Sequence, residues 1–119
     1  MIHEEKKVAK IIEELTMFFF SLGADEIETC IKRDGNSDFI WFSSNYNPEF
    51  KDELHYLEKY LNKEKNDGLE DIYWELAGSG DPGESSQLLL IGMMIDKADI
   101  EINDSKVELK LYKKFRKGY

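Results

Sequence analysis

The N-terminal part of the chain has apolar and polar positions arranged with the period of an α-helix. Apolar side chains recur three and four positions apart from Val8 to Leu22, and charged side chains occupy most of the positions between them. That spacing places the apolar positions on one stripe, which faces a core. Gly23 favours an end to the segment, because glycine adopts the left-handed conformation without steric cost. The pattern therefore predicts a helix over about 4–22.

Two hairpins are predicted from alternating apolar and polar residues further along the chain. Alternation on both sides of Asp34-Gly35-Asn36 predicts an antiparallel hairpin over about 25–44. Its second strand is apolar on both faces, which is typical of an inner strand. Alternation on both sides of Asn103-Asp104-Ser105 predicts a second hairpin over about 98–114.

The middle of the chain contains further candidate elements. Helical spacing of apolar residues predicts helices over about 49–63 and 69–77, and a Gly- and Pro-rich segment at 77–83 predicts a loop. The apolar run 88–95 fits a buried helix or a buried strand, because its period does not separate the two. Since Ser85 or Ser86 would cap a helix well, we expect a helix over about 85–95 and leave the strand as the alternative.

The order of these elements predicts the fold class. A chain of 119 residues fits one domain over residues 1–119. Strands fall in two hairpins with helices before and between them, which indicates an α+β fold. We expect a two-layer sandwich, in which the hairpins form a mostly antiparallel mixed sheet and the helices pack on one face.

Composition excludes several classes of protein. With 41% hydrophobic and 34% charged residues, the chain is globular rather than disordered. No apolar run reaches the roughly 18–20 residues of a membrane-spanning helix, and the amino end lacks the pattern of a secretory signal. We therefore expect a cytoplasmic protein with no membrane partner. The single cysteine, Cys30, excludes an internal disulfide.

The charge distribution bears on possible partners. A net charge of −9 argues against nucleic-acid binding, because phosphate backbones attract cationic surfaces. Residues 66–105 contain ten acids and one base, whereas residues 106–119 contain six bases and one acid. Such a basic end could meet an acidic protein partner or the acidic middle of a second copy. The simpler interpretation is a charged final strand with a solvated end.

Two candidate reactive groups have simpler interpretations. His55 shares a helix face with Asp52 and Glu58, but two histidines in the chain leave too few ligands for a typical metal site. We therefore expect no metal. Cys30 has no sequence neighbour that would lower the pKa of its thiol, and we expect a small buried or half-buried apolar side chain.

Glycines at 78–83 could cradle a phosphate at the start of a helix. No lysine follows them as in a P-loop, and Asp81 and Glu84 would repel an anion. A plain connection is the favoured interpretation.

Aromatic residues are numerous, and most of them are expected in the core. The surplus could line a ligand pocket or form an association surface. The residues in question are Phe18, Phe19, Phe20, Phe39, Trp41, Phe42, Tyr46, Tyr73 and Trp74.

The order of elements resembles the ATP-binding domain shared by sensor histidine kinases, DNA gyrase and the anti-sigma-factor serine kinases. Residues 14–28 look like the family's first helix and strand, and residues 88–113 look like its last helix and hairpin. In that family the first helix carries a magnesium-binding asparagine, and the first hairpin ends in an Asp-x-Gly turn that reads adenine. A glycine-rich phosphate turn opens the last helix.

The family's nucleotide-binding positions are altered in this sequence. Phe18 stands at the position of the asparagine, and a phenyl ring offers no oxygen to magnesium. Ser44, followed by Asn45, replaces the adenine-reading aspartate, and Tyr46 replaces the glycine. The phosphate turn falls near Ser85–Gln87, which contains no glycine. The resemblance therefore implies a degenerate site, with no cofactor and no Mg-ATP bound in the family manner.

These observations support three hypotheses about function. The leading one is a non-catalytic, bacterial-type protein-interaction or regulatory module that associates with itself or with a signalling partner. The alternative is a small-ligand-binding protein or enzyme of unrelated α+β fold, with an aromatic-lined pocket and acids such as Asp52, Glu53 or Asp81. An active anti-sigma-like kinase with shifted motifs is disfavoured by Phe18.

Overall fold

The computed structural model of this protein describes residues 2–62 and 87–114. Its elements in chain order are helix α1 (Ile2–Ser21), strands β1 (Ile27–Asp34) and β2 (Ser37–Asn45), 3-10 helix η1 (Pro48–Leu54), helices α2 (His55–Leu61) and α4 (Gln87–Met94), and strands β3 (Lys97–Ile102) and β4 (Lys106–Lys114). The expected helix over 69–77, the loop at 77–83 and Ser85 lie outside the described residues. The described residues form an α+β fold, as predicted.

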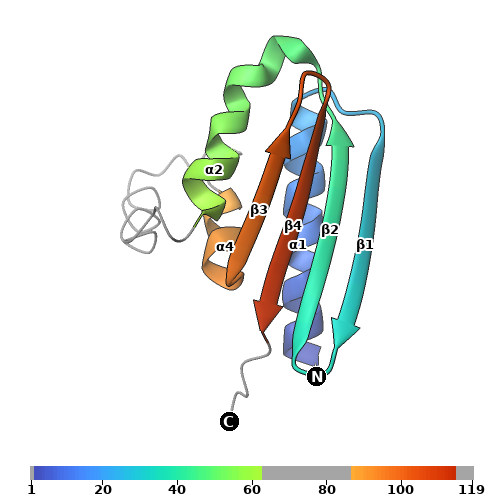
Figure 1. The fold of residues 1–119 in the computed structure, drawn as a ribbon, viewed down its shortest axis with the longest axis vertical. Helices are drawn as coiled ribbons and strands as arrows, with labels where there is room; N and C mark the ends of the chain where they lie inside the picture. The colour runs from blue at the N-terminus through green and yellow to red at the C-terminus, as the bar shows by residue number, and fades with distance from the viewer. Residues whose placement is uncertain (1, 63–86, 115–119) are drawn as a thin grey trace.

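The four strands form one open antiparallel sheet in the order β1-β2-β4-β3 (Figure 1). Each hairpin pairs its own two strands, and the hairpins meet through β2 and β4. These two strands also run in opposite directions, so the described strands contain no parallel pair. The expectation of a mixed sheet is therefore wrong for this part of the chain. β2 is an inner strand, as its apolar pattern predicted.

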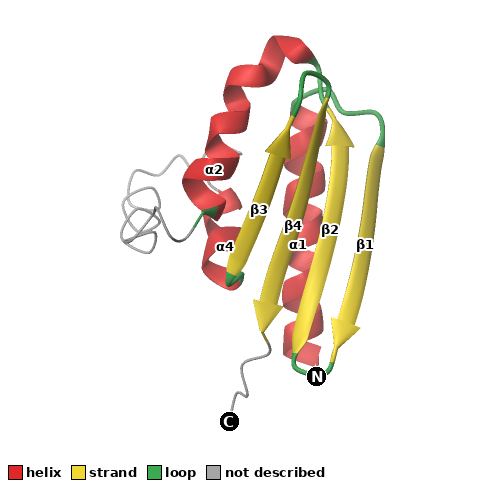
Figure 2. Cartoon of the chain, viewed as in Figure 1, coloured by secondary structure: helices red, strands yellow, loops and turns green. Residues whose placement is uncertain are grey.

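The described helices lie on one face of the sheet, and no described element covers the opposite face (Figure 2). In β2 the residues alternate strictly between buried and half-buried. Ile40 and Phe42 face the helices and are fully buried. Their neighbours Phe39 and Trp41 point to the uncovered face, because successive side chains of a strand point to opposite sides.

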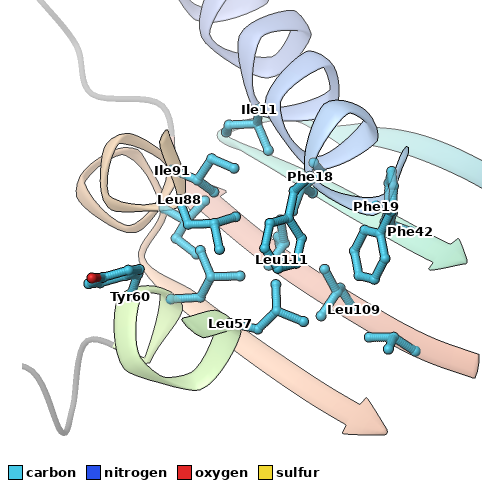
Figure 3. Close-up of a cluster of buried hydrophobic side chains, with 14 of the residues drawn as sticks. Ile11, Phe18, Phe19, Phe42, Leu57, Tyr60, Leu88, Ile91, Leu109 and Leu111 are labelled. Carbon is cyan, nitrogen blue, oxygen red and sulfur yellow. The ribbon is translucent and has the colours of Figure 1, made fainter. Parts of the chain in front are cut away.

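The core is built from the stripe of α1 and from the helix-facing residues of β2 and β4 (Figure 3). Ile11, Leu15 and Phe19 of α1 are fully buried. The ring of Phe19 lies 5.5 Å from that of Phe42, centroid to centroid. Burial of side chains of this size contributes roughly 1.5–3 kcal/mol each.

The apolar run at 88–95 forms a helix, α4, which removes the ambiguity in the sequence. Its Leu88, Leu89 and Ile91 are fully buried, and Ile95 after it is buried as well. The run has no polar face because α4 packs against both α1 and α2. A helix enclosed on several sides is apolar at nearly every position, as a buried strand is. The spacing of apolar residues therefore could not distinguish helix from strand.

The turn after α1 depends on Gly23. This glycine has φ +82°, in the left-handed region, and the amide of Ala24 donates to the carbonyl of Phe19 at 3.0 Å. A Cβ at position 23 would lie 3.2 Å from Cβ of Asn47. Glycine therefore ends α1, as predicted, and also permits the close approach of the segment after β2. Among the described helices, none combines the length and apolarity that a bilayer crossing requires.

Candidate functional site

Phe18 is part of the core. Its side chain is 4% exposed, and its ring meets that of Phe19 edge-on at 5.3 Å. Figure 3 shows both rings projecting from α1 toward the sheet and the buried leucines. The position that resembles the family's magnesium ligand is therefore filled by a packed hydrocarbon ring.

Ser44 and Tyr46, at the positions compared with the Asp-x-Gly turn, make internal hydrogen bonds. Ser44 is buried, and its hydroxyl donates to the carbonyl of Asn45 at 2.8 Å. The hydroxyl of Tyr46, also buried, donates to the carbonyl of Asn103 in the β3–β4 turn at 2.5 Å. The Tyr46 bond ties the end of β2 to the second hairpin, whereas the Ser44 bond stays within β2.

The side chain of Asn45 forms hydrogen bonds with the segment just before β1. Its side-chain oxygen accepts the backbone amides of Asp25 at 3.0 Å and Glu26 at 3.1 Å. Its amide nitrogen donates to the Asp25 carboxylate at 2.6 Å. Both ends of this side chain are engaged in holding the first hairpin together. Nothing in the local sequence pattern signals this role.

The structure does not bring the candidate nucleotide positions around one cavity. A cavity of about 390 Å³ lies beside α2 and β3 and is lined in part by Glu58, Asn62, Asp99, Glu101, Glu108 and Lys110. Phe18, Ser44 and Gln87 are not among its lining residues. Its surface is acidic rather than aromatic, which differs from the pocket that the ligand-binding hypothesis expected.

The uncovered side of the sheet carries an aromatic cluster. We call this side the open face and define it by Phe39, Trp41, Tyr112 and three lysines, Lys32, Lys97 and Lys110. Phe39 and Tyr112 are paired across β2 and β4, with ring centroids 5.1 Å apart. Trp41 lies two residues further along β2, on the same face and opposite Lys110. The sequence indicated an aromatic surplus, but only strand order shows which aromatic residues share a face.

Lysines surround these rings. The ammonium of Lys97 lies 5.6 Å from the centre of the Tyr112 ring, within the range of a cation–π contact. Lys32 of β1 is the cross-strand neighbour of Phe39 on the side away from β4. Glu28, Glu108 and Glu101 form an acidic row further along the same face, because the register aligns them across β1, β4 and β3. The face therefore has a basic, aromatic part and an acidic part.

A buried ion pair lies on the helix-covered side of the sheet, between α1 and β4. Nζ of Lys113 donates to Oε2 of Glu4 at 2.6 Å, and both side chains are almost fully buried. The hydrogen bond from Lys113 lowers the pKa of Glu4 below its ordinary 4.5, and although burial opposes this shift, the charges of Lys113 and Lys7 reinforce it. This pair is structural in position, since it lies at the end of the core.

Asp38 lies directly across from Lys113 in the register and is also buried. Its Oδ1 accepts Nε of Arg33 at 2.8 Å, whereas Oδ2 has no hydrogen-bond partner in the described part of the chain. Arg33 also lies 3.3 Å from the carboxylate of Glu5 on α1. Charged groups therefore join the first hairpin to α1 at this end of the sheet.

The remaining sequence candidates are dispersed. Nδ1 of His55 lies 2.6 Å from the backbone carbonyl of Asp52. Within residues 2–62 and 87–114, no cluster of histidine, cysteine and acidic side chains has a metal-binding arrangement. Cys30 is exposed, which corrects the expectation of a buried or half-buried thiol. The reason is that β1 is an edge strand and Cys30 points to the open face beside Trp41.

In comparisons with known proteins, no family model, no curated protein and no solved structure matches the chain.

Proposed function

We propose that this chain is a non-catalytic protein-interaction module with a degenerate ATPase-like fold. The observation that carries the proposal is the open face, where Phe39, Trp41 and Tyr112 project from neighbouring inner strands with no described helix over them. Aromatic residues are enriched at protein interfaces, because they provide a large contact area at little cost in conformational entropy. A sheet face of this kind favours a binding role.

The core contacts of the nucleotide positions support the non-catalytic part of the proposal. The ring of Phe18 packs against Phe19 and has no oxygen for a cation. Tyr46 is bonded to the second hairpin, so its side chain occupies the place where the family has a glycine. A nucleotide bound in the family manner would have to displace both side chains from the core.

The lysines of the open face indicate the chemistry of the partner. Lys32 and Lys97 border the aromatic rings, whereas Lys110 lies 3.7 Å from the Glu108 carboxylate. The complementary surface is therefore apolar with acidic groups near Lys32 and Lys97. A protein segment combines these two properties. Single-stranded nucleic acid also stacks on aromatic rings, but the acidic row of Glu28, Glu101 and Glu108 on the same face opposes a phosphate backbone.

A peptide-display selection with the intact protein tests the docking surface. We expect selected sequences to combine Asp or Glu with Leu, Phe or Trp, and to lose binding to the double variant Phe39→Ser/Tyr112→Ser. Phe20→Ser is the matched control, because Phe20 is 55% exposed on α1, away from the open face. Selected peptides that bind the double variant equally well would overturn the docking surface. Tighter binding of an oligothymidylate than of any selected peptide would replace the protein partner by nucleic acid.

Calorimetric titration with ATP and magnesium tests the non-nucleotide part. We expect no heat of binding at micromolar protein and nucleotide. Micromolar affinity that persists in Phe39→Ser/Tyr112→Ser would contradict this part of the proposal and leave the docking surface untouched.

The acidic cavity supports a second candidate function, the binding of a small organic cation. Glu58, Asp99 and Glu101 supply carboxylates around a volume suited to a small ligand. Titration with spermidine, in wild type and in Glu101→Gln, tests it: binding weakened by the substitution would support this function, and no binding would exclude it for that ligand class.

A further inference from the structure

Among the described strands, β1 is an edge strand whose outer side has no partner. It has one neighbour in the sheet, β2, and seven of its eight residues are exposed. Figure 1 places β1 at the side of the sheet away from α2 and α4. Such an edge presents unpaired backbone groups that can pair with another extended chain.

The hydrogen-bond pattern shows which residues offer their backbone to this edge. The amide of Asn45 donates to the carbonyl of Glu26, so this pair is hydrogen-bonded toward β2. Hydrogen-bonded pairs alternate along an antiparallel ladder. Thr29, together with Ile27 and Ile31 two positions away on each side, therefore directs its N–H and C=O outward. Any partner strand has to pair with these residues.

The side chains along β1 are complementary to those of a second β1 strand that runs antiparallel to it. Glu26, one residue before β1, and Lys32 lie three positions on either side of Thr29, and both are exposed. The alternation of an extended chain places both on the open face. A second β1 in antiparallel orientation, with Thr29 opposite Thr29, places Lys32 of each copy opposite Glu26 of the other. Opposite charges across a strand pair are stabilising, and like charges are destabilising.

The apolar residues agree with the same alignment. Ile31 is 44% exposed at the edge, and in this register it lies opposite Ile27 of the second copy. A register centred on Cys30 places Glu26 opposite Asp34, and one centred on Ile31 places Glu28 opposite Asp34. Both alternatives oppose two carboxylates, although the Cys30 register also places Lys32 opposite Glu28. The Thr29 register opposes no like charges, so the charges favour Thr29 as the centre.

We propose that two copies of this protein associate through their β1 strands, antiparallel and with Thr29 on the two-fold axis, forming one continuous eight-stranded sheet. The partner at this edge is thus a second copy of the chain, because the two-fold symmetric contact forms the Glu26–Lys32 pair twice. This inference is independent of the proposed docking of a partner on the open face, since the aromatic cluster lies on inner strands.

Charge reversal with rescue tests the pairing in the full-length protein. We expect a dimer by sedimentation equilibrium, and an increase of about tenfold or more in its dissociation constant in Lys32→Glu and in Glu26→Lys, because each change creates two like-charged pairs. The double variant restores both pairs and the net charge, so it should dimerise like wild type. Lys6→Glu, on the exposed side of α1, is the matched control for the change in net charge.

Each result of this set decides the proposal. A wild-type monomer at 100 µM, a dimer unaffected by Lys32→Glu, or a double variant that stays monomeric while its circular dichroism is native would overturn it. Disulfide trapping then checks the register: Thr29→Cys in a Cys30→Ser background should cross-link on mild oxidation faster than native Cys30. Faster cross-linking of native Cys30 would overturn the register.

Discussion

Glu4 and Lys113 are 109 residues apart in the sequence and form a buried ion pair of 2.6 Å between the first helix and the last strand. The geometry predicts that removal of one partner is costly, because an uncompensated charge then stays buried. We expect Lys113→Met to lower the free energy of unfolding by about 3–5 kcal/mol, measured by urea denaturation. Lys114→Met, at the exposed neighbouring position, should change it by less than about 0.5 kcal/mol. Glu4→Leu combined with Lys113→Met should recover most of the loss, and a Lys113→Met variant as stable as wild type would show that the pair is unimportant.

The same pair makes stability depend on pH in the acid range. Because the pKa of Glu4 is lower in the folded protein than its ordinary 4.5, mainly through the hydrogen bond from Lys113, protons bind more strongly to the unfolded chain. The contribution of Glu4 is therefore complete above pH 4.5 and is lost as the pH falls through its lowered pKa. We expect the stability difference between wild type and Glu4→Gln to shrink as the pH falls from the ordinary pKa of 4.5 through the lowered pKa of Glu4. A difference that is constant over this range would be inconsistent with the shifted pKa.

Gly23 and Gly35 both have positive φ, but only Gly23 has a close neighbour. Gly23→Ala brings a Cβ to 3.2 Å from Asn47 in a backbone conformation of φ +82°, so we expect a loss of about 1–3 kcal/mol in unfolding free energy. Gly35→Ala, with φ +55° and open space around it, should lose only the conformational part, about 1 kcal/mol. Thermal or urea unfolding of both variants gives the comparison. Equal losses would mean that the contact with Asn47 relaxes freely.

Phe18→Asn restores the residue type that the family resemblance expects at this position. The change removes a buried ring and places an amide in the core, so we expect a loss of about 3–5 kcal/mol in unfolding free energy. We also expect no gain of Mg-ATP binding by calorimetry, because Ser44 and Tyr46 keep their internal hydrogen bonds. Phe20→Asn is the control at an exposed position of the same helix. A stable Phe18→Asn variant that binds Mg-ATP would show that the nucleotide site is intact apart from one residue.

Much of the fold could be predicted from the sequence because its signals are local. The stripe of α1 and the turn at Gly35 involve residues close in the chain, and the apolar second strand correctly indicated an inner position for β2. The order of the four strands has no local signal. The expected burial of Cys30 was wrong for this reason, since burial on a strand depends on which neighbour lies beside it.

The candidate site shows the same limit. The sequence indicated the aromatic surplus, but it did not show that Phe39 and Tyr112 meet across β2 and β4. The buried role of Lys113 had one available signal. Lys113 continues the alternation of Val107, Leu109 and Leu111, which places it on the buried face of β4. Because lysine is charged, the sequence pattern did not indicate that it is buried.

The placement of β4 between β2 and β3 has a consequence for biosynthesis. β4 is the last strand in the described chain and yet pairs with a neighbour on each side. A nascent chain that has emerged only as far as β3 holds the first hairpin with one side of β2 unpaired and Phe42 unsupported by Leu109. Assembly of the sheet must therefore wait for β4. Until β4 has emerged, the apolar strand β2 stays exposed to chaperones and to neighbouring nascent chains.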